Sequence, residues 1–221
     1  QTLIVGSLTV LIVTVGLAQV WQNSRFRRDD IERRQSAARA LLAYRLSVLE
    51  DYIASHLDQI IALYRDWDRR FLEGPPYIDM STVKYPDQDI LNEIAASAEY
   101  IDSRASRRVE TLLNAMQVEL DRYKVLTSDE MVRSTILATR ENVEECIAYI
   151  LWVDALRISL YTYARGGSYG LGPLGENVLV ERLKLQSFPN EYYYETVDEL
   201  DPFLRKKASD FMFHRFPNDD Y

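Results

Sequence analysis

The chain has 221 residues, of which 47% are hydrophobic and 27% are charged, and this composition is typical of a globular protein with one sizeable core. The net charge of −8 is unevenly divided, because residues 1–45 carry seven arginines against three acidic residues, a balance of +4, and residues 46–221 carry −12. An acidic domain behind a short basic segment argues against nucleic acid as a partner.

The first predicted element is an apolar helix over residues 2–21. No charged side chain occurs between Gln1 and Ser24. About twenty apolar residues at roughly 1.5 Å each match the roughly 30 Å hydrocarbon layer of a bilayer. We therefore expect residues 1–24 to form a single transmembrane anchor in contact with the lipid bilayer. A secretory signal peptide is the alternative, because residues 16–18 include the small side chains of a cleavage site.

A basic segment follows the apolar run and sets the expected topology. The positive-inside rule places this flank in the cytoplasm. We expect residues 25–35 to be a juxtamembrane neck, residues 36–221 to be a cytoplasmic helical domain, and the bacterial inner membrane to be the location. The neck could also contact anionic lipid, although we favour an ordinary topology signal as its explanation. Its basic residues are Arg25, Arg27, Arg28, Arg33 and Arg34.

Small or hydroxylated residues recur on one face of the predicted span. Thr2, Gly6, Thr9 and Gly16 follow helical spacing, with Val13 interrupting the series. Small faces let helices approach closely within a membrane, so these four residues form a candidate helix interface. Chance composition is the alternative, and the branched Val13 favours it.

An amphipathic helix is predicted after the neck. Its apolar residues step by three and four positions, and the stripe is wide enough for packing inside a helical bundle. The pattern ends at residues 74–76, which read Gly-Pro-Pro. The stripe comprises Leu46, Leu49, Ile53, His56, Ile60, Leu63 and Trp67.

Two further long helices follow in the predicted order. The second runs through apolar residues from Ile90 to Leu120. The third begins after a capping box, in which Thr127 reaches forward and Glu130 reaches back. It ends at a glycine-rich stretch that begins at Gly166.

The glycine-rich stretch contains Gly170, Gly172 and Gly175 in the spacing G-x-G-x-x-G. A dinucleotide site needs a strand before this pattern, and here a helical pattern precedes it. Pro173 also removes one backbone N–H that could face a phosphate. We therefore interpret the stretch as a connector between helices and expect no nucleotide.

Two shorter helices complete the predicted fold. One runs from about Glu176 to Leu185, and the last begins at Asp201 as N-cap with Pro202 at the first helical position. The fold class is therefore all-α: a single N-terminal transmembrane helix and a soluble bundle of three long and two shorter helices. Between the short helices lies a candidate partner surface, because aromatic clusters are enriched at interfaces, although they also close the ends of bundles. Its residues are Phe188, Tyr192, Tyr193 and Tyr194.

Residues with the chemistry of a metal site are few. His56, His214 and Cys146 lie on three different predicted elements. Asp210 and His214 are four positions apart and could form a hydrogen-bonded pair, but two ligands do not make a metal site. We expect no metal and no cofactor.

Three polar residues fall in apolar helical patterns. Two adjacent carboxylates, Glu144 and Glu145, should raise the pKa of the Cys146 thiol. His56 is expected to be a core histidine bonded to a carbonyl or a carboxylate, with a pH-sensitive role as the alternative. Asp154 should pair with an arginine of a neighbouring helix rather than act as a catalytic acid.

No catalytic constellation emerges from these patterns. We therefore expect a membrane-anchored interaction or assembly subunit without catalytic activity, bound to a protein partner or forming a homo-oligomer. The alternative is a single-pass sensor or effector, whose helical domain binds a ligand or partner and changes its oligomeric state.

Overall fold

The computed structural model describes residues 2–65, 86–127, 139–167, 171–187 and 192–215. Within these ranges every regular element is helical, which confirms the predicted all-α bundle. Side chains are described for the same residues except 2–18, 20, 124–127, 187, 192–194 and 214–215. The chain divides into two compact units, residues 1–38 and residues 39–221.

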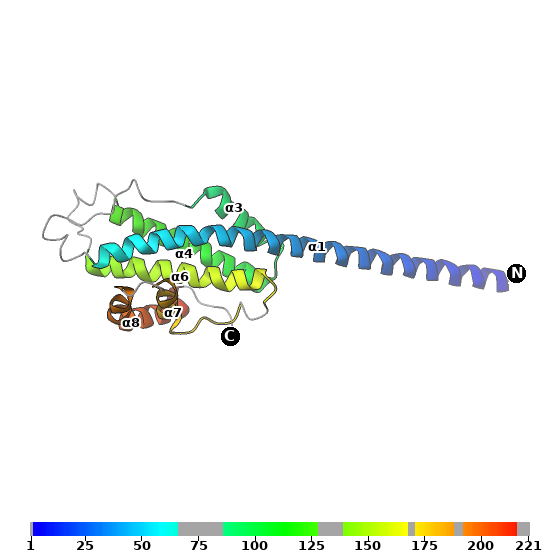
Figure 1. Ribbon diagram of the computed structural model, residues 1–221. Helices are drawn as coiled ribbons and strands as arrows, with labels where there is room; N and C mark the ends of the chain where they lie inside the picture. Colours follow the sequence, from blue (N-terminus) through cyan, green and yellow to red (C-terminus); the bar gives the residue numbers. More distant parts are fainter. Residues whose placement is uncertain (1, 66–85, 128–138, 168–170, 188–191, 216–221) are drawn as a thin grey trace. The chain divides into compact units, whose positions relative to one another are not determined.

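The first helix, α1, runs from Thr2 to Arg65 (Figure 1). In the part of the chain that the structure describes, no helix is both long and apolar enough to cross a lipid bilayer. From Arg25 to Arg65, uncharged runs in α1 are at most six residues long, whereas a span needs about twenty. The lack of a membrane-spanning helix among the described residues contradicts the predicted transmembrane anchor at residues 1–24. It also contradicts the predicted single-pass topology and the cytoplasmic, inner-membrane location.

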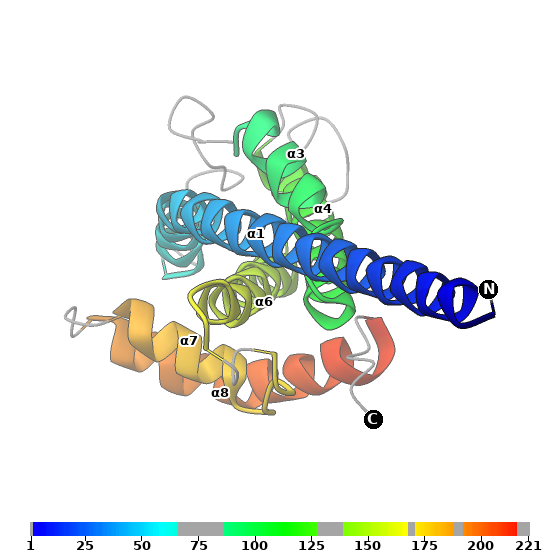
Figure 2. The same ribbon diagram turned by 90° about the vertical axis from the view of Figure 1, so that its right-hand side faces the viewer.

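The second unit is a bundle built around α6 (Arg140–Ala164). The described part of α1 in this unit lies beside α4 (Ser103–Thr127) and α6, and the short helix α3 (Gln88–Ser97) precedes α4. Two further helices, α7 (Val178–Ser187) and α8 (Tyr192–Asp210), lie side by side and cover another face of α6 (Figures 1 and 2). A π-helix, η2 (Phe211–Arg215), extends α8.

Helix α6 is enclosed on all sides. Every residue from Cys146 to Arg157 is buried, so its sequence is apolar around the whole circumference rather than along one stripe. Thr139 caps its first turn, where the side-chain oxygen accepts a hydrogen bond from the Asn142 N–H at 3.2 Å. Its polar residues Asp154, Arg157 and Ser159 are therefore held in the interior.

The amphipathic stripe of α1 is confirmed. Its residues are at most 1% exposed, and they face the interior of the bundle. Because each residue of this stripe lies three or four positions from the next, local spacing alone was sufficient to predict it. The buried members are Leu46, Leu49, Ile53, His56, Ile60 and Leu63, whereas Trp67 and the predicted helix end at residues 74–76 lie outside the described residues.

The second predicted helix is divided in two, which corrects the prediction of one unbroken element. Helix α3 ends at Ser97, and α4 begins at Ser103. The Asp102 carboxylate accepts a hydrogen bond from the Ala105 N–H at 3.0 Å, so Asp102 acts as the N-cap of α4. A short polar side chain inside an apolar pattern therefore starts a new helix.

Two predicted helix starts are also wrong. Thr127 is the last residue of α4 rather than the N-cap of the next helix, and residues 128–138, with the rest of the predicted capping box, lie outside the described residues. Helix α8 begins at Tyr192 and continues through Pro202. Val197, Leu200 and Leu204 are buried on both sides of this proline, and their packing offsets the cost of about 3 kcal/mol of an interior proline.

Candidate functional site

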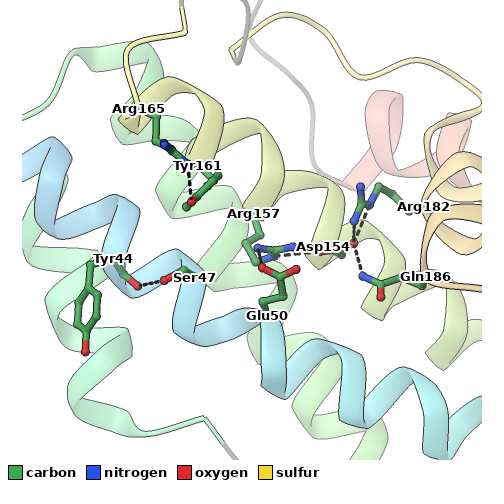
Figure 3. A network of polar contacts seen from close by, with 9 residues as sticks. All are labelled: Tyr44, Ser47, Glu50, Asp154, Arg157, Tyr161, Arg165, Arg182 and Gln186. Carbon is green, nitrogen blue, oxygen red and sulfur yellow. Dashed lines mark hydrogen bonds and ion pairs between the residues drawn. The ribbon is translucent and has the colours of Figure 1, made fainter. Parts of the chain in front are cut away.

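A buried ionic cluster around Asp154 joins two helices of the bundle (Figure 3). Oδ1 of Asp154 accepts a hydrogen bond from Arg157 Nε, one turn along α6, at 2.9 Å. Oδ2 accepts from Arg182 Nε of α7 at 2.6 Å and from Gln186 Nε2 at 3.4 Å. The predicted pairing of Asp154 with an arginine of a neighbouring helix is confirmed.

Arg157 extends this cluster to a third helix. Its Nη1 donates to Oε2 of Glu50 on α1 at 3.2 Å, and the Glu50 side chain is 57% exposed (Figure 3). Two arginines thus balance two carboxylates, and the buried charges are tolerated because each is paired. Both oxygens of Asp154 accept hydrogen bonds, so this arrangement fastens α1, α6 and α7 together and does not resemble a carboxylate positioned for acid–base chemistry.

A second buried cluster surrounds His56 on α1. Its Nδ1 lies 3.1 Å from Oε1 of Glu119 on α4, and both side chains are at most 1% exposed. The Tyr52 hydroxyl donates to Oε2 of Glu119 at 2.8 Å. The rings of Tyr52 and Tyr123 contact the imidazole, each with 4.1 Å between ring centroids. The prediction of a core histidine bonded to a carboxylate is confirmed.

Cys146 lies in the same part of the core, on α6. Burial is the main cause that raises the pKa of its thiol to about 12, and the charges of Glu119 and Glu145 contribute to the same shift. The predicted direction of the shift is confirmed, but desolvation rather than the adjacent carboxylates is its main cause. A thiol with such a pKa is a weak nucleophile near neutral pH.

Two tyrosine–arginine contacts hold α1 at the edges of the bundle. Arg39 Nε donates to the Tyr163 hydroxyl at 3.0 Å, and the guanidinium stacks over the ring at 4.4 Å. Burial raises the pKa of Tyr163. The Asp102 carboxylate accepts hydrogen bonds, and its Oδ2 lies 3.8 Å from Nη2 of Arg39. Burial alone would raise the pKa of Asp102, but these contacts outweigh it and lower the pKa.

Tyr64, in the last turn of α1, makes a similar contact with an arginine. Arg140 Nη2 donates to its hydroxyl at 2.8 Å, and the Tyr64 hydroxyl lies 3.3 Å from Oε2 of Glu199 on α8. Partial burial raises the pKa of Tyr64. The contact joins α1, α6 and α8, so it too has a structural role.

The glycine-rich stretch joins α6 to α7, which confirms the predicted connector. Gly166 has φ +90° and lies at the C′ position of α6, and the N–H of Gly167 reaches the Thr162 carbonyl at 2.9 Å. This is the Schellman arrangement that ends a helix. Gly172 accepts a hydrogen bond from Arg108 Nη2 at 3.2 Å, whereas Gly170 lies outside the described residues.

The predicted contact residues are only partly described. The five arginines of the neck are exposed on α1, and Arg34 pairs with Asp30 at 2.9 Å. The side chains of Thr2, Gly6, Thr9 and Gly16, of Tyr192, Tyr193 and Tyr194, and of His214 lie outside the described part, as does Phe188 altogether. These candidate interfaces therefore stay predictions.

The sequence interpretation missed the partners in the two buried clusters. Glu119 follows Met116 by three positions and precedes Tyr123 by four, so it continues the buried stripe of α4, and this spacing could have revealed it. Arg182 and Glu50 gave no such signal, because neither continues a buried stripe: the Arg182 side chain is 14% exposed and that of Glu50 is 57% exposed. Among the described side chains, no group of three potential ligands could hold a metal ion.

Comparison with protein families, with characterised proteins and with solved structures finds no match to this chain. The function is therefore inferred from the side-chain arrangement alone.

Proposed function

We propose that the chain is a non-catalytic helical interaction subunit that assembles with a protein partner. One observation carries the proposal: five of the eight large apolar side chains exposed in the described residues belong to α1. Three lie in the first unit, and two, Leu41 and Tyr44, lie in the second, where they are 43% and 59% exposed. Exposed apolar side chains gathered on one helix are typical of an interaction surface.

The buried polar residues support the same interpretation. Asp154 joins α6 to α7 through Arg182, and His56 joins α1 to α4 through Glu119, so these bonds fix the packing of the bundle. A catalytic role would need such groups in an accessible cleft. Here burial of Asp154 and His56 is complete, which favours structural use.

Charge favours a different protein over a second copy of this chain. Residues 39–221 carry a net charge of −10, so two such units repel each other. A partner with basic groups around an apolar groove would complement both the charge and the pair Leu41 and Tyr44. We therefore assign the α1 surface of the second unit to a basic protein partner.

Site-specific photo-crosslinking in the native host tests this assignment. A photoreactive phenylalanine analogue replaces Tyr44 in the full chain, and a control chain carries it in place of Asn114, which is exposed on α4. We expect one basic protein to be crosslinked from position 44 and not from position 114. Leu41→Ser in the same chain should remove that product while the protein remains folded.

Two results contradict the proposal. Crosslinking of position 44 to a second copy of the chain would assign the surface to self-association. Equal products from positions 44 and 114, or a product that survives Leu41→Ser, would show that this surface of α1 does not select a partner.

A further inference from the structure

We propose that the partner binds this chain with a basic amphipathic helix, which lies along the exposed face of α1 from Tyr44 to Ala62. The inference rests on the proposed interaction surface and deepens it, because it names the element of the partner that binds. The pair Leu41 and Tyr44 is then one end of a longer docking face.

The exposed residues of α1 in the second unit have the spacing of a helix–helix contact. From Tyr44 onward they step by four, three, four, three and four positions, so they stay on one side of the helix for about five turns. This side is opposite the buried stripe. Four of the six residues are exposed and two are half-buried, and we call them the docking face: Tyr44, Val48, Asp51, Ser55, Asp58 and Ala62.

The shape of the docking face suits a helix. Tyr44 is 59% exposed at one end, and aromatic anchors of this kind carry much of the energy of binding. Ser55 and Ala62 are small, and small side chains let the backbones of two helices approach closely. The side chains of a helix form ridges with grooves between them, so a partner helix offers the apolar groove that Tyr44 requires.

The charge of the docking face favours a basic occupant. Residues 46–64 contain three acidic residues, Glu50, Asp51 and Asp58, and no lysine or arginine. All three are exposed. Lysine and arginine side chains on the rim of a partner helix complement these charges, whereas a second copy of the chain presents the same acidic face and is repelled.

Glu50 flanks the docking face as a carboxylate that is already held in place. Its Oε2 accepts a hydrogen bond from Arg157 Nη1 at 3.2 Å, while its side chain is 57% exposed (Figure 3). Arg157 is itself held by Asp154 at 2.9 Å. A basic side chain that binds Glu50 therefore orders a group with little freedom left to lose, and this lowers the entropic cost of the contact.

Photo-crosslinking at both ends of the docking face, in the native host, measures the shape of the bound segment. A photoreactive phenylalanine analogue replaces Tyr44 in one full chain and Ala62 in another, and mass spectrometry locates the crosslinked points in the partner. The two positions are 18 residues apart on α1, a length of about 27 Å. A helix covers this length with about 18 residues and an extended segment with about 8.

We expect both positions to be crosslinked to one protein, at points about 18 residues apart in a segment with more lysine and arginine than acidic residues. A third chain carries the analogue in place of Asp58, which is 14 positions from Tyr44. It supplies the second point, about 14 residues from the first, if the larger side chain at position 62 prevents binding.

A charge reversal tests the acidic character of the docking face. Asp51→Arg is introduced into the chain that carries the analogue at position 44. The matched control is Glu110→Arg, which makes the same change of charge at an exposed residue of α4. We expect Asp51→Arg to lower the yield of the product about 3–10-fold, because it replaces an attraction by a repulsion, and the control to leave the yield unchanged.

This inference and the proposed function fail in different ways. A product from position 44 with none from position 58 or 62 would overturn the helix and leave the Tyr44 surface assigned. Crosslinked points about 8 residues apart, or in separate segments, would do the same, and so would equal losses from Asp51→Arg and Glu110→Arg. The lack of any product from position 44 would contradict the proposed function and the inference together.

Discussion

Asp154 shows what a buried polar residue contributes to this bundle. It is the shared acceptor for Arg157, whose side chain is 1% exposed, and for Arg182, whose side chain is 14% exposed. Asp154→Asn keeps the shape but removes the charge that balances the two arginines. We expect a loss of about 3–5 kcal/mol in the free energy of unfolding, because breaking a buried pair leaves an uncompensated charge. Urea denaturation measures the loss.

The exposed pair Asp201–Arg205 provides the control for this experiment. Its hydrogen bond lowers the pKa of Asp201, but both groups are on the surface, where water screens their attraction. Asp201→Asn should leave the urea midpoint close to that of the wild type. Equal effects of Asp154→Asn and Asp201→Asn would mean that the buried cluster contributes no more than a surface ion pair.

Gly166 and Gly175 lie in the same connector but have different backbone requirements. Gly166 has φ +90°, whereas Gly175 has space for a Cβ, with no atom within 4 Å. Gly166→Ala should cost about 1–2 kcal/mol, because L-residues are strained in the left-handed region. Gly175→Ala should be neutral or stabilising by up to about 1 kcal/mol. Thermal unfolding of both variants tests the difference, and a neutral Gly166→Ala would argue against the Schellman end of α6.

At the scale of an element, α1 has one face in the core and another exposed. The adjacent residues Leu42 and Leu41 are 0% and 43% exposed. Leu42→Ala should destabilise the bundle by about 2–5 kcal/mol, whereas Leu41→Ala should change its stability by no more than about 0.5 kcal/mol. Denaturant midpoints of the two variants measure which face packs. Similar losses would show that Leu41 is also covered in the isolated chain.

The elements were predicted well where their signals are local. The stripe of α1 repeats every three or four residues, and the predicted inward residues Val143, Ile147 and Ile150 of α6 have the same spacing, although α6 is buried on every side from Cys146 onward. The predicted helix boundaries were wrong where a local signal competes with the packing of a buried face. Pro202 is a valid helix start by itself, but the buried face that continues from Val197 to Leu204 overrides it. The uncharged run at residues 2–21 predicted a helix correctly and its membrane role wrongly.

The sequence predicted single residues of the candidate site but not the residues that they contact. His56 and Asp154 stand out because polar side chains occur within apolar stripes. Their partners do not, since Glu119 is 63 positions from His56 and Arg182 is 28 positions from Asp154. Sequence spacing carries no information on contacts between helices so far apart, and the fold alone brings them together.

At the scale of the whole molecule, burial of Cys146 makes the fold sensitive to alkaline pH. The thiol has a pKa of about 12 in the folded state and about 8.5 in an unfolded chain. Between these values the folded state binds more protons than the unfolded state, so the contribution of Cys146 is complete below about pH 8.5 and is lost as pH rises. We expect the folding constant to fall by about tenfold per pH unit from pH 9 to pH 11 on account of this one group. The raised pKa values of Tyr64 and Tyr163 add to the decline.

The variant Cys146→Ala separates the thiol from the two tyrosines, because it removes one titrating group and leaves the other two. Its urea unfolding profile should decline less steeply than that of the wild type, by one bound proton, over the same range. Thiol labelling of the wild type with a chromogenic disulfide should remain slow up to the pH at which the bundle unfolds, since only the unfolded chain exposes an ionised Cys146. Profiles of equal slope, or rapid labelling of the folded chain at pH 9, would show that the thiol ionises within the bundle and that its burial does not set the alkaline limit of the fold.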